Sequence, residues 1–389
     1  MKTRRLLVVA SAALVVCALL AVNRSQVAFA AAGAKSAADS FLKDTQKGDP
    51  KLKSIGTITF GPQGLLLVSE PTAASIVAID TGDTGPVQKL KQKVDDVAGH
   101  VAARLGAPEG GADILDIAVN PLSGKIYLAV SRKADKQVAI LTVDADGKLA
   151  DLALDKAAWV RVPLPAAEGV KVSSITDVAF AKDRVLAAGQ SNEEFSSKIF
   201  SFPLPLVNAK SGDVFSAQTY HVAHRKWETK APIQSFIPYE EKGKHYVVGA
   251  FTCTPIVKFP LDDIKSGGDI RGTSVVELGN GNRPLDMFTY ERGGKTWVVA
   301  NTQRFQANLF GPSKFWGVRV TMDYLTHNEP ENTNEKAAWR DVKSKSGPEG
   351  IEIVDALFGA RHIDKLNNDQ MVVLRENGDK LSLELAPLP

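Results

Sequence analysis

The stretch DILDIAVNPLSGKIYLAVSRKADKQVAILTVD, residues 113–144, carries the pattern from which the fold of this chain is predicted. Apolar and polar residues alternate along three short runs, and Asn, Gly and Asp stand where the runs are interrupted. Alternation with a period of two is typical of strands, and Gly, Asn and Asp favour tight turns. The stretch therefore predicts a three-stranded antiparallel meander.

The same pattern recurs along the rest of the chain. Counting residues 113–144 as repeat 2, the other copies are 54–80 (repeat 1), 174–204 (repeat 3), 232–261 (repeat 4), 284–323 (repeat 5) and 362–385 (repeat 6). Recurrence at intervals of roughly 50 to 80 residues is typical of a β-propeller, in which each blade is one small sheet.

We therefore predict an all-β protein, a β-propeller of six blades that spans residues 54–389 as a single domain. Seven blades is the alternative count, because 324–361 is long enough to contain a degenerate blade. A β-sandwich is the competing architecture, but it would not need the same meander six times. Residues 87–105 have helical spacing and predict a small helical insertion on the outside of repeat 1.

The N-terminal segment predicts export. A basic stretch is followed by an apolar run from Leu6 to Val22 and by small residues, which indicates a signal peptide over 1–30. An uncleaved membrane anchor is the alternative. Residues 31–53 are polar and predict a short helix or a tether. We expect a periplasmic or extracellular protein that has no membrane association once the signal is cleaved.

Composition and missing motifs exclude several classes of function. Cleavage would remove Lys2, Arg4, Arg5 and Arg24 and no acid, so the formal charge would fall by four, from +3 to −1. Such a chain has no electrostatic reason to bind nucleic acid. The sequence also lacks CxxCH, HExxH, GxSxG and GxGxxG, so a covalent haem, a zinc-protease helix, a nucleophile elbow and a nucleotide turn are unsupported.

Aligning the first strands of the repeats brings six polar residues into one register. In a propeller the first strand of each blade lines the central channel. One interpretation is a cation or water site on the axis. The other is that each carboxylate caps backbone N–H groups of the neighbouring blade. The channel-lining candidates are Thr57, Asp116, Asp177, Ser235, Asp286 and Asp364.

Unusual polar residues occur in loops that a propeller would place on one face, mostly in repeats 3 to 5. Arg283 and Arg304 can each bind a carboxylate or phosphate through two hydrogen bonds. Alternatively, Arg283 and Asp286 form a structural ion pair. The candidate ligand-binding residues are Asn192, Glu193, Arg225, Trp227, Glu228, Cys253, Asn282, Arg283, Asp286, Asn301 and Arg304.

The histidines and the cysteine give weaker signals. His221 and His224 are three positions apart in a strand-like stretch, which would point them to opposite faces, so no metal site is predicted there. His362 begins the inner strand of repeat 6 and is placed to reach the channel mouth. Cys253 is the only thiol beyond the signal peptide, so no intramolecular disulfide can form. We expect it at a tight corner, either as a small buried group or as a thiol at the rim of the site.

Several blocks of repeats 3 to 5 resemble a known group. SNEEFSSKIFSFPLP, HRKWETKAPIQSFIPY, FTCTPIVKFPL and ELGNGNRPLDMFTYERGGKTWVVAN look like signature blocks of exported bacterial β-propeller proteins without a characterised function. More broadly, the chain is similar to YVTN-repeat and quinoprotein amine dehydrogenase β-chain-like propellers. That resemblance implies the fold and an exported location. The YVTN tetrapeptide itself is absent, and no quinone or haem ligand set carries over.

Three functional hypotheses follow. The leading one is an exported propeller without a cofactor that binds a small polar or anionic ligand, or a periplasmic protein partner, on the face of repeats 3 to 5. The second is a hydrolase or lactonase with one divalent metal ion at the channel mouth, held by Asp116, Asp177 and Asp286 with Glu193 or Asn301. The third is an accessory subunit of a periplasmic redox complex, which rests on the resemblance alone.

Overall fold

The computed structural model describes residues 36–389 except 166–167, 254, 263–265, 280, 306–310, 327–336 and 342–346. The described residues belong to one structural unit, Ser36–Pro389. The predicted signal peptide lies outside them. No helix within the described ranges has the length and hydropathy needed to cross a bilayer.

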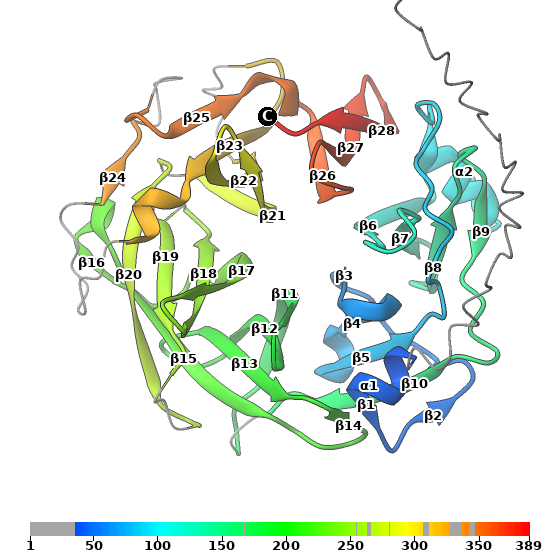
Figure 1. Ribbon diagram of the computed structural model, residues 1–389, viewed down its shortest axis with the longest axis horizontal. Helices are drawn as coiled ribbons and strands as arrows, with labels where there is room; N and C mark the ends of the chain where they lie inside the picture. Colours follow the sequence, from blue (N-terminus) through cyan, green and yellow to red (C-terminus); the bar gives the residue numbers. More distant parts are fainter. Residues whose placement is uncertain are drawn as a thin grey trace, which may run out of the picture. The chain divides into compact units, whose positions relative to one another are not determined.

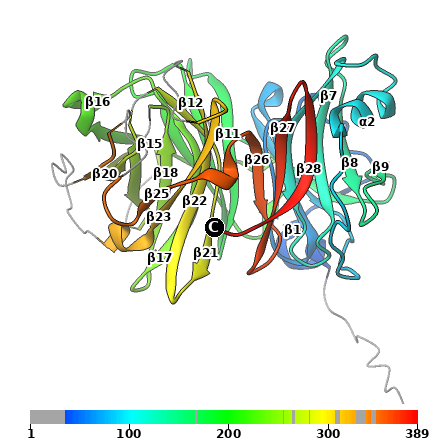
Figure 2. The ribbon, with the colours of Figure 1, turned by 90° about the horizontal axis from the view of Figure 1, so that it is seen from above.

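All six repeats form antiparallel meanders around a central axis, with the first strand of each nearest the axis (Figures 1 and 2). The first strands are β3 (Ile58–Phe60), β6 (Ala112–Val119), β11 (Val172–Ala181), β17 (Ile233–Glu241), β21 (Asn282–Arg292) and β26 (Ala360–Lys365). The second strands are β4 (Leu65–Glu70), β7 (Ile126–Arg132), β12 (Arg184–Ser191), β18 (Lys244–Phe251), β22 (Lys295–Arg304) and β27 (Gln370–Asn377). The third strands are β5 (Ser75–Asp80), β8 (Val138–Val143), β13 (Ser197–Pro203), β19 (Pro255–Pro260), β23 (Phe315–Thr321) and β28 (Lys380–Pro387). The all-β prediction is confirmed, and the arrangement of the sheets is propeller-like.

Outer strands that the repeat pattern did not reveal extend repeats 1 to 5. In repeat order they are β10 (Ala158–Pro163), β9 (Leu149–Asp151), β15 (Asp213–His221), β20 (Asp269–Glu277) and β25 (Ile351–Val354). Because β15 and β20 pair in parallel, repeats 3 and 4 share one ten-stranded sheet. Within 324–361, the described strands β24 (Ala338–Trp339) and β25 pair with β20 and β23, so they extend sheets that already exist.

The order of the repeats around the axis differs from their order in the chain. After repeat 2, strand β10 returns to pair with β5 of repeat 1. Apolar clusters fill the spaces between repeats 1 and 3, 3 and 4, 4 and 5, 5 and 6, 6 and 2, and 2 and 1. The ring therefore runs 1-3-4-5-6-2, and in Figure 1 the blue repeat 1 lies between the green repeat 3 and the cyan repeat 2.

The segment before repeat 1 is part of this packing. Helix α1 (Ala37–Phe41) is followed by β1 (Leu42–Lys43), which pairs with β14 (Leu206–Val207), and by β2 (Gln46–Lys47), which pairs with β10. The side chains of Ala37 and Leu42 are buried in the cluster between repeats 1 and 3. These residues therefore contribute to the core.

The helical insertion is shorter than predicted and packs elsewhere. Helix α2 (Val97–Arg104) begins after Asp96, whose side chain accepts a hydrogen bond from the N–H of Gly99. Just before it, Val94 forms a β-bridge with Leu383, which keeps that part of 87–105 out of the helix. Val97 and Val101 are buried in the cluster between repeats 2 and 6, so the helix covers those repeats and not the outside of repeat 1.

Short elements occupy the connections. Strand β16 (Lys226–Glu228) pairs with β15. The 3₁₀ helices are η1 (Pro62–Gly64), η2 (Pro71–Ala73), η3 (Val222–His224), η4 (Met322–Thr326) and η5 (Asp355–Leu357).

Candidate functional site

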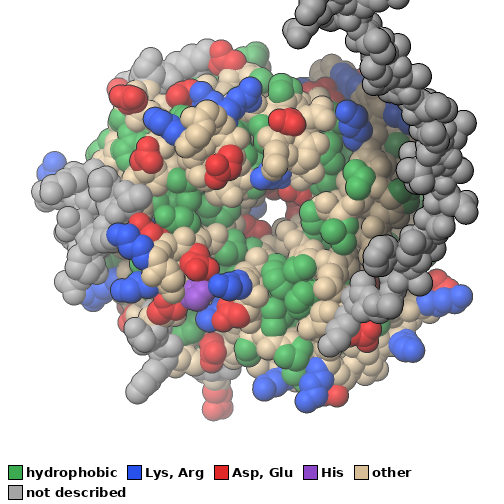
Figure 3. Space-filling view, in the orientation of Figure 1, with side chains coloured by type: hydrophobic (Ala, Val, Ile, Leu, Met, Phe, Trp, Pro, Cys, Tyr) green, Lys and Arg blue, Asp and Glu red, His purple; other side chains and the backbone are tan. Residues whose placement is uncertain are grey.

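The six residues aligned by register surround one cavity on the axis, of about 200 Å³. This cavity, called the channel below, is lined by the first strands of all six repeats. At one end it meets a cavity of about 500 Å³, called the mouth, and Thr57, Asp116, Leu285 and Asp286 line both. Figure 3 shows the opening at the centre of the ring, with acidic and basic side chains at its rim.

The carboxylates of the channel hold neighbouring repeats together. Each accepts a hydrogen bond from a backbone N–H of the next repeat: Asp177 from Phe236 (2.8 Å), Asp286 from Ile363 (3.0 Å), Asp364 from Val119 (2.6 Å) and Asp116 from Ile58 (2.7 Å). These bonds all run in the same direction around the ring, from repeat 3 to 4, 5 to 6, 6 to 2 and 2 to 1. The four carboxylates therefore cap backbone N–H groups of the neighbouring repeat, which is the second of the two interpretations given for the register.

Burial raises the pKa of three channel carboxyls, those of Asp177, Asp286 and Asp364. It raises the pKa of Asp177 to about 8 and that of Asp364 to about 7, although backbone N–H donors act in the opposite direction. Both groups therefore carry a proton for part of the time near neutral pH, which weakens the attraction of the channel for cations.

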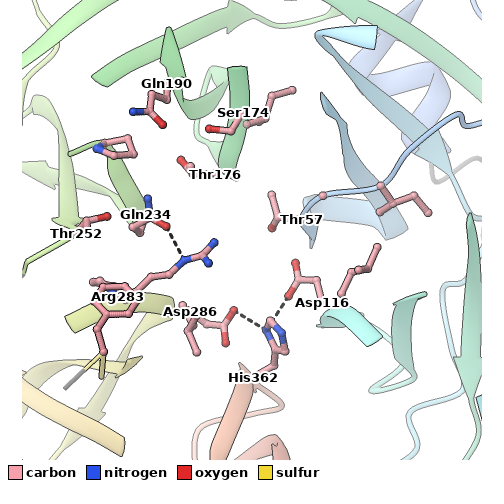
Figure 4. A pocket seen from close by; sticks show the side chains of 18 residues that line it. Thr57, Asp116, Ser174, Thr176, Gln190, Gln234, Thr252, Arg283, Asp286 and His362 are labelled. Carbon is pink, nitrogen blue, oxygen red and sulfur yellow. Dashed lines mark hydrogen bonds and ion pairs between the residues drawn. The ribbon is translucent and has the colours of Figure 1, made fainter. Parts of the chain in front are cut away.

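His362 lies between two carboxylates at the floor of the mouth (Figure 4). Its Nδ1 atom is 3.2 Å from Oδ1 of Asp286 and 3.4 Å from Oδ1 of Asp116. Burial alone would lower the pKa of His362, but the two carboxylates raise it to about 10. At neutral pH the floor thus holds an imidazolium whose charge is already paired.

Arg283 is the second cationic group of the mouth. Its Nε atom donates a hydrogen bond to Oε1 of Gln234 (3.0 Å), and its guanidinium extends into the cavity (Figure 4). Asp286 pairs with His362, and among the described residues no carboxylate lies within 4.0 Å of the Arg283 guanidinium. Its charge is therefore available to a ligand.

The remaining wall of the mouth combines polar and apolar side chains. Hydroxyl and amide groups line it together with Ile55, Leu115, Ile175, Pro232, Pro284, Leu285 and Phe305, and the last of these is 58% exposed. Every repeat contributes, so the cavity is not confined to repeats 3 to 5. The polar wall residues outside the channel register are Ser174, Thr176, Gln190, Gln234 and Thr252.

A sequence signal for some of these wall residues exists. In five repeats the residue directly before the register position lines the mouth: Gly56, Leu115, Thr176, Gln234 and Leu285. Successive strand residues point to opposite faces, but the pairing with the second strand skips Leu115, Thr176 and Gln234, and such a bulge lets the extra residue border the cavity beside the register position. Applying this rule to the alignment would have identified Thr176 and Gln234.

Of the predicted ligand-binding residues, only Arg283 and Asp286 line the mouth. Asn301 is fully buried and joins repeats 5 and 6, because it accepts from the N–H of Asp286 and donates to the carbonyls of Ala360 and Arg361. Its amide therefore stabilises the wall from behind.

Asn282 and Arg304 are also buried beside the wall. Asn282 accepts a hydrogen bond from Nε1 of Trp316 (3.0 Å), and the Arg304 guanidinium lies 4.9 Å from the centre of the Trp316 ring. Burial lowers the pKa of Arg304 to about 10. Both side chains thus pack against a core tryptophan.

Asn192 and Glu193 lie at a separate place in repeat 3. Asn192 accepts a hydrogen bond from the N–H of Lys171, and Glu193 forms an ion pair of 2.9 Å with the buried Lys198. Glu193 and Lys198 line a third cavity of about 330 Å³. Glu193 therefore does not join the carboxylates of the mouth.

Cys253 stands at a tight corner, as expected, but does not line the mouth, whereas its neighbour Thr252 does. Its φ angle is 71°, in the left-handed region, and its N–H donates to the carbonyl of Asn282 (2.9 Å). The thiol is partly exposed.

Arg225, Trp227 and Glu228 lie in the connection between β15 and β17, near the two histidines. Trp227 packs against Tyr220 and lies under the Arg271 guanidinium, and Arg225 is exposed. The expectation that His221 and His224 point apart was wrong, because β15 ends at His221 and η3 turns the chain there. The two rings are 4.0 Å apart.

Comparisons with known proteins add little. No protein-family model and no curated protein sequence matches this chain. A PQQ-bound aldose sugar dehydrogenase from Streptomyces coelicolor is 14% identical, with a TM-score of 0.32, over 88% of this chain and 96% of that one. A putative oxidoreductase (glucose dehydrogenase) from Thermus thermophilus is 11% identical, with a TM-score of 0.30, over 88% and 99%. Similarities at this level give no information on the ligand or the reaction of this chain. The similarity to YVTN-repeat propellers stays a prediction.

Proposed function

We propose that this chain is an exported, six-bladed β-propeller that binds a small anionic ligand in the mouth of its channel. The carrying observation is Arg283, a guanidinium that extends into a cavity of about 500 Å³ and is hydrogen-bonded to Gln234. A guanidinium binds a carboxylate or phosphate through two parallel hydrogen bonds. A cavity of this size is typical of sites for small molecules.

The other polar groups of the mouth suit a ligand that carries hydroxyl groups in addition to its anionic group. Thr57, Ser174 and Thr176 offer hydroxyls, and Gln190 and Gln234 offer amides. Such groups hydrogen-bond to hydroxyls of a ligand. The exposed ring of Phe305 and the side chains of Ile55 and Leu285 offer apolar contacts to the carbon skeleton of such a ligand. A hydroxylated carboxylic acid, such as a sugar acid, matches this distribution.

The test is a binding measurement on the parent and on matched arginine variants. Gluconate, glucuronate and inorganic phosphate serve as anionic probes, and glucose serves as the neutral one. We expect Arg283→Ala to weaken binding of the anionic probes at least tenfold, as the loss of a charged hydrogen-bonding pair predicts. Arg104→Ala, which alters an exposed arginine of α2, is the control and keeps the parent affinity. Equal affinity in the Arg283→Ala protein, or no binding of any anionic probe to the parent at millimolar concentration, would contradict the proposal.

A second candidate is metal-dependent hydrolysis at the same place. One observation favours it: donor atoms of Asp116, Asp286 and His362 all lie within 4.8 Å of one another. A divalent ion there would polarise a carbonyl or activate water. Against it, the oxygens of Asp116 already accept hydrogen bonds from the N–H groups of Ile58 and Ile117. Metal-dependent turnover of lactone or ester substrates that His362→Gln abolishes would favour this candidate over simple binding.

A further inference from the structure

A second cluster of chemically active side chains lies away from the mouth, in the connection between β15 and β17. Donor atoms of His221, His224 and Glu228 all lie within 4.8 Å of one another. None of these residues lines the mouth or the channel. We propose that the three side chains bind one divalent transition-metal ion and that Glu277 orients His221 for this purpose.

His221 supplies the first argument. Its side chain is 1% exposed, yet neither ring nitrogen has a hydrogen-bond partner among the residues that the structure describes. Nδ1 lies 3.9 Å from Oε2 of Glu228, which is too far for a hydrogen bond. Leaving a buried polar atom without a partner is unfavourable. A metal ion between Nδ1 and the carboxylate would satisfy both atoms.

The two carboxylates are held in position by the backbone. Oε1 of Glu228 accepts hydrogen bonds from the N–H groups of Lys230 (2.9 Å) and Ala231 (3.0 Å), and Oε1 of Glu277 accepts one from Val222 (3.1 Å). Each glutamate therefore presents its other oxygen to His221. Backbone donors thus fix the orientation of both carboxylates, as a preorganised metal site requires.

Glu277 occupies the far side of the imidazole. Its Oε2 atom is 3.3 Å from Nε2 of His221, and its side chain is 1% exposed. Metal-binding histidines commonly have a carboxylate hydrogen-bonded to the ring nitrogen that does not bind the metal, and a small rotation of the His221 ring would turn the 3.3 Å approach of Nε2 to Oε2 into that bond. Glu277 is thus a positioning residue, and Nδ1 is the nitrogen left for the ion.

The local backbone explains how two histidines share one side of this segment. A 3₁₀ helix has three residues per turn, so side chains three positions apart lie above one another. His221 precedes η3 and His224 ends it, and the ring centroids are 4.0 Å apart. Strand β16 then runs back along β15 and places Glu228 opposite Thr219. His224 is exposed, which gives an ion a route from solvent.

The donor set indicates the class of metal. Two imidazoles and one carboxylate suit Zn²⁺ and other late first-row divalent ions and leave a coordination position for water. Bonds of about 2.1 Å at tetrahedral angles separate two ligand atoms by roughly 3.4 Å. The distance from His221 to Glu228 would therefore shorten by about half an ångström on binding, within the freedom of a side chain.

The test uses the untagged full-length chain, stripped with a chelator and titrated with Zn²⁺ by calorimetry and with Co²⁺ by visible absorption. We expect one equivalent to bind at this site and the Co²⁺ spectrum to show low coordination number with nitrogen ligands. His224→Ala removes an exposed ligand, so it should leave the fold intact, and we expect it to weaken binding at least tenfold. His100→Ala alters an exposed histidine of α2 and should bind as the parent does.

Three results would overturn the inference. Unchanged affinity in His224→Ala would show that the cluster is not the site. Loss of binding in His362→Gln but not in His224→Ala would place the ion in the channel mouth. If the parent protein does not bind Zn²⁺ at micromolar concentrations, His221 is instead an imidazolium paired with two glutamates. Circular dichroism of His224→Ala checks that the variant is folded. None of these results depends on the anionic ligand proposed for the mouth.

Discussion

Asp364 accepts a hydrogen bond from the backbone N–H of Val119 across 2.6 Å, although the two residues are 245 positions apart in the chain. This bond joins the first strand of repeat 6 to that of repeat 2. In a ring that followed chain order, the last repeat would close on the first. The contact is therefore direct evidence for the ring order 1-3-4-5-6-2. The carboxylate of Asp364 also accepts a hydrogen bond from the N–H of Lys365 in its own strand.

Removing this bond should destabilise the ring where it closes. Asp364→Ala leaves the Val119 N–H without its acceptor, and we expect the free energy of unfolding to fall by about 1 to 3 kcal/mol. Urea denaturation followed by tryptophan fluorescence measures the change. Asp369→Ala, an exposed aspartate of the next turn, is the control and should alter the midpoint little. Equal midpoints for the two variants would mean that the bond does not stabilise the closure.

The protonation of His362 should make stability depend on pH. Its folded-state pKa of about 10 lies above the value of about 6.5 for an unfolded histidine, so the folded protein binds the proton more tightly. The stabilisation is fully present below pH 6.5 and is lost as the pH rises through 10.

His362→Gln removes that contribution, so the stability difference between parent and variant should shrink with rising pH. Between pH 6.5 and 10 we expect a slope of up to about 1.4 kcal/mol per pH unit. Denaturant titrations at pH 6, 7, 8, 9 and 10 give the two curves, with His100→Gln as the surface control. Parallel curves for parent and His362→Gln would rule out a paired imidazolium at the mouth.

The strand that returns from repeat 2 to repeat 1 depends on a buried charge. Glu70 is fully buried, and its Oε2 atom lies 2.8 Å from Nε of Arg161 in β10. Arg161→Ala would leave this carboxylate without its cation, and we expect a loss of about 3 kcal/mol. The exposed pair of Arg104 and Asp151 is the matched case, for which Arg104→Ala should cost less than about 1 kcal/mol. Thermal and urea unfolding of both variants measure the two losses in the free energy of unfolding. Similar losses would show that other donors compensate the charge of Glu70.

Much of the channel was predictable from the sequence, whereas most of the mouth was not. Thr57, Asp116, Asp177, Ser235, Asp286 and Asp364 line one cavity because a strand has a fixed period, so aligned strands place equivalent residues at equivalent positions. Asn282 and Arg304 were grouped with Arg283 because all three were expected in loops on one face of the propeller. Instead β21 begins at Asn282 and β22 ends at Arg304, and these two side chains turn to Trp316. The histidine cluster was missed because η3 interrupts a stretch that reads as a strand.

Strands, turns and the register of the inner carboxylates are local properties, since alternation and turn chemistry act over a few neighbouring residues, and these follow from the amino-acid sequence alone. Which repeats become neighbours depends on apolar faces that are distant in the chain, such as those between repeats 6 and 2. The same holds for charge: Asp286 stands three positions from Arg283 but pairs with His362, 76 positions away. Only the tertiary structure decided that pairing, because it set which opposite charge came within reach, and among the described residues it left no carboxylate within 4.0 Å of the Arg283 guanidinium.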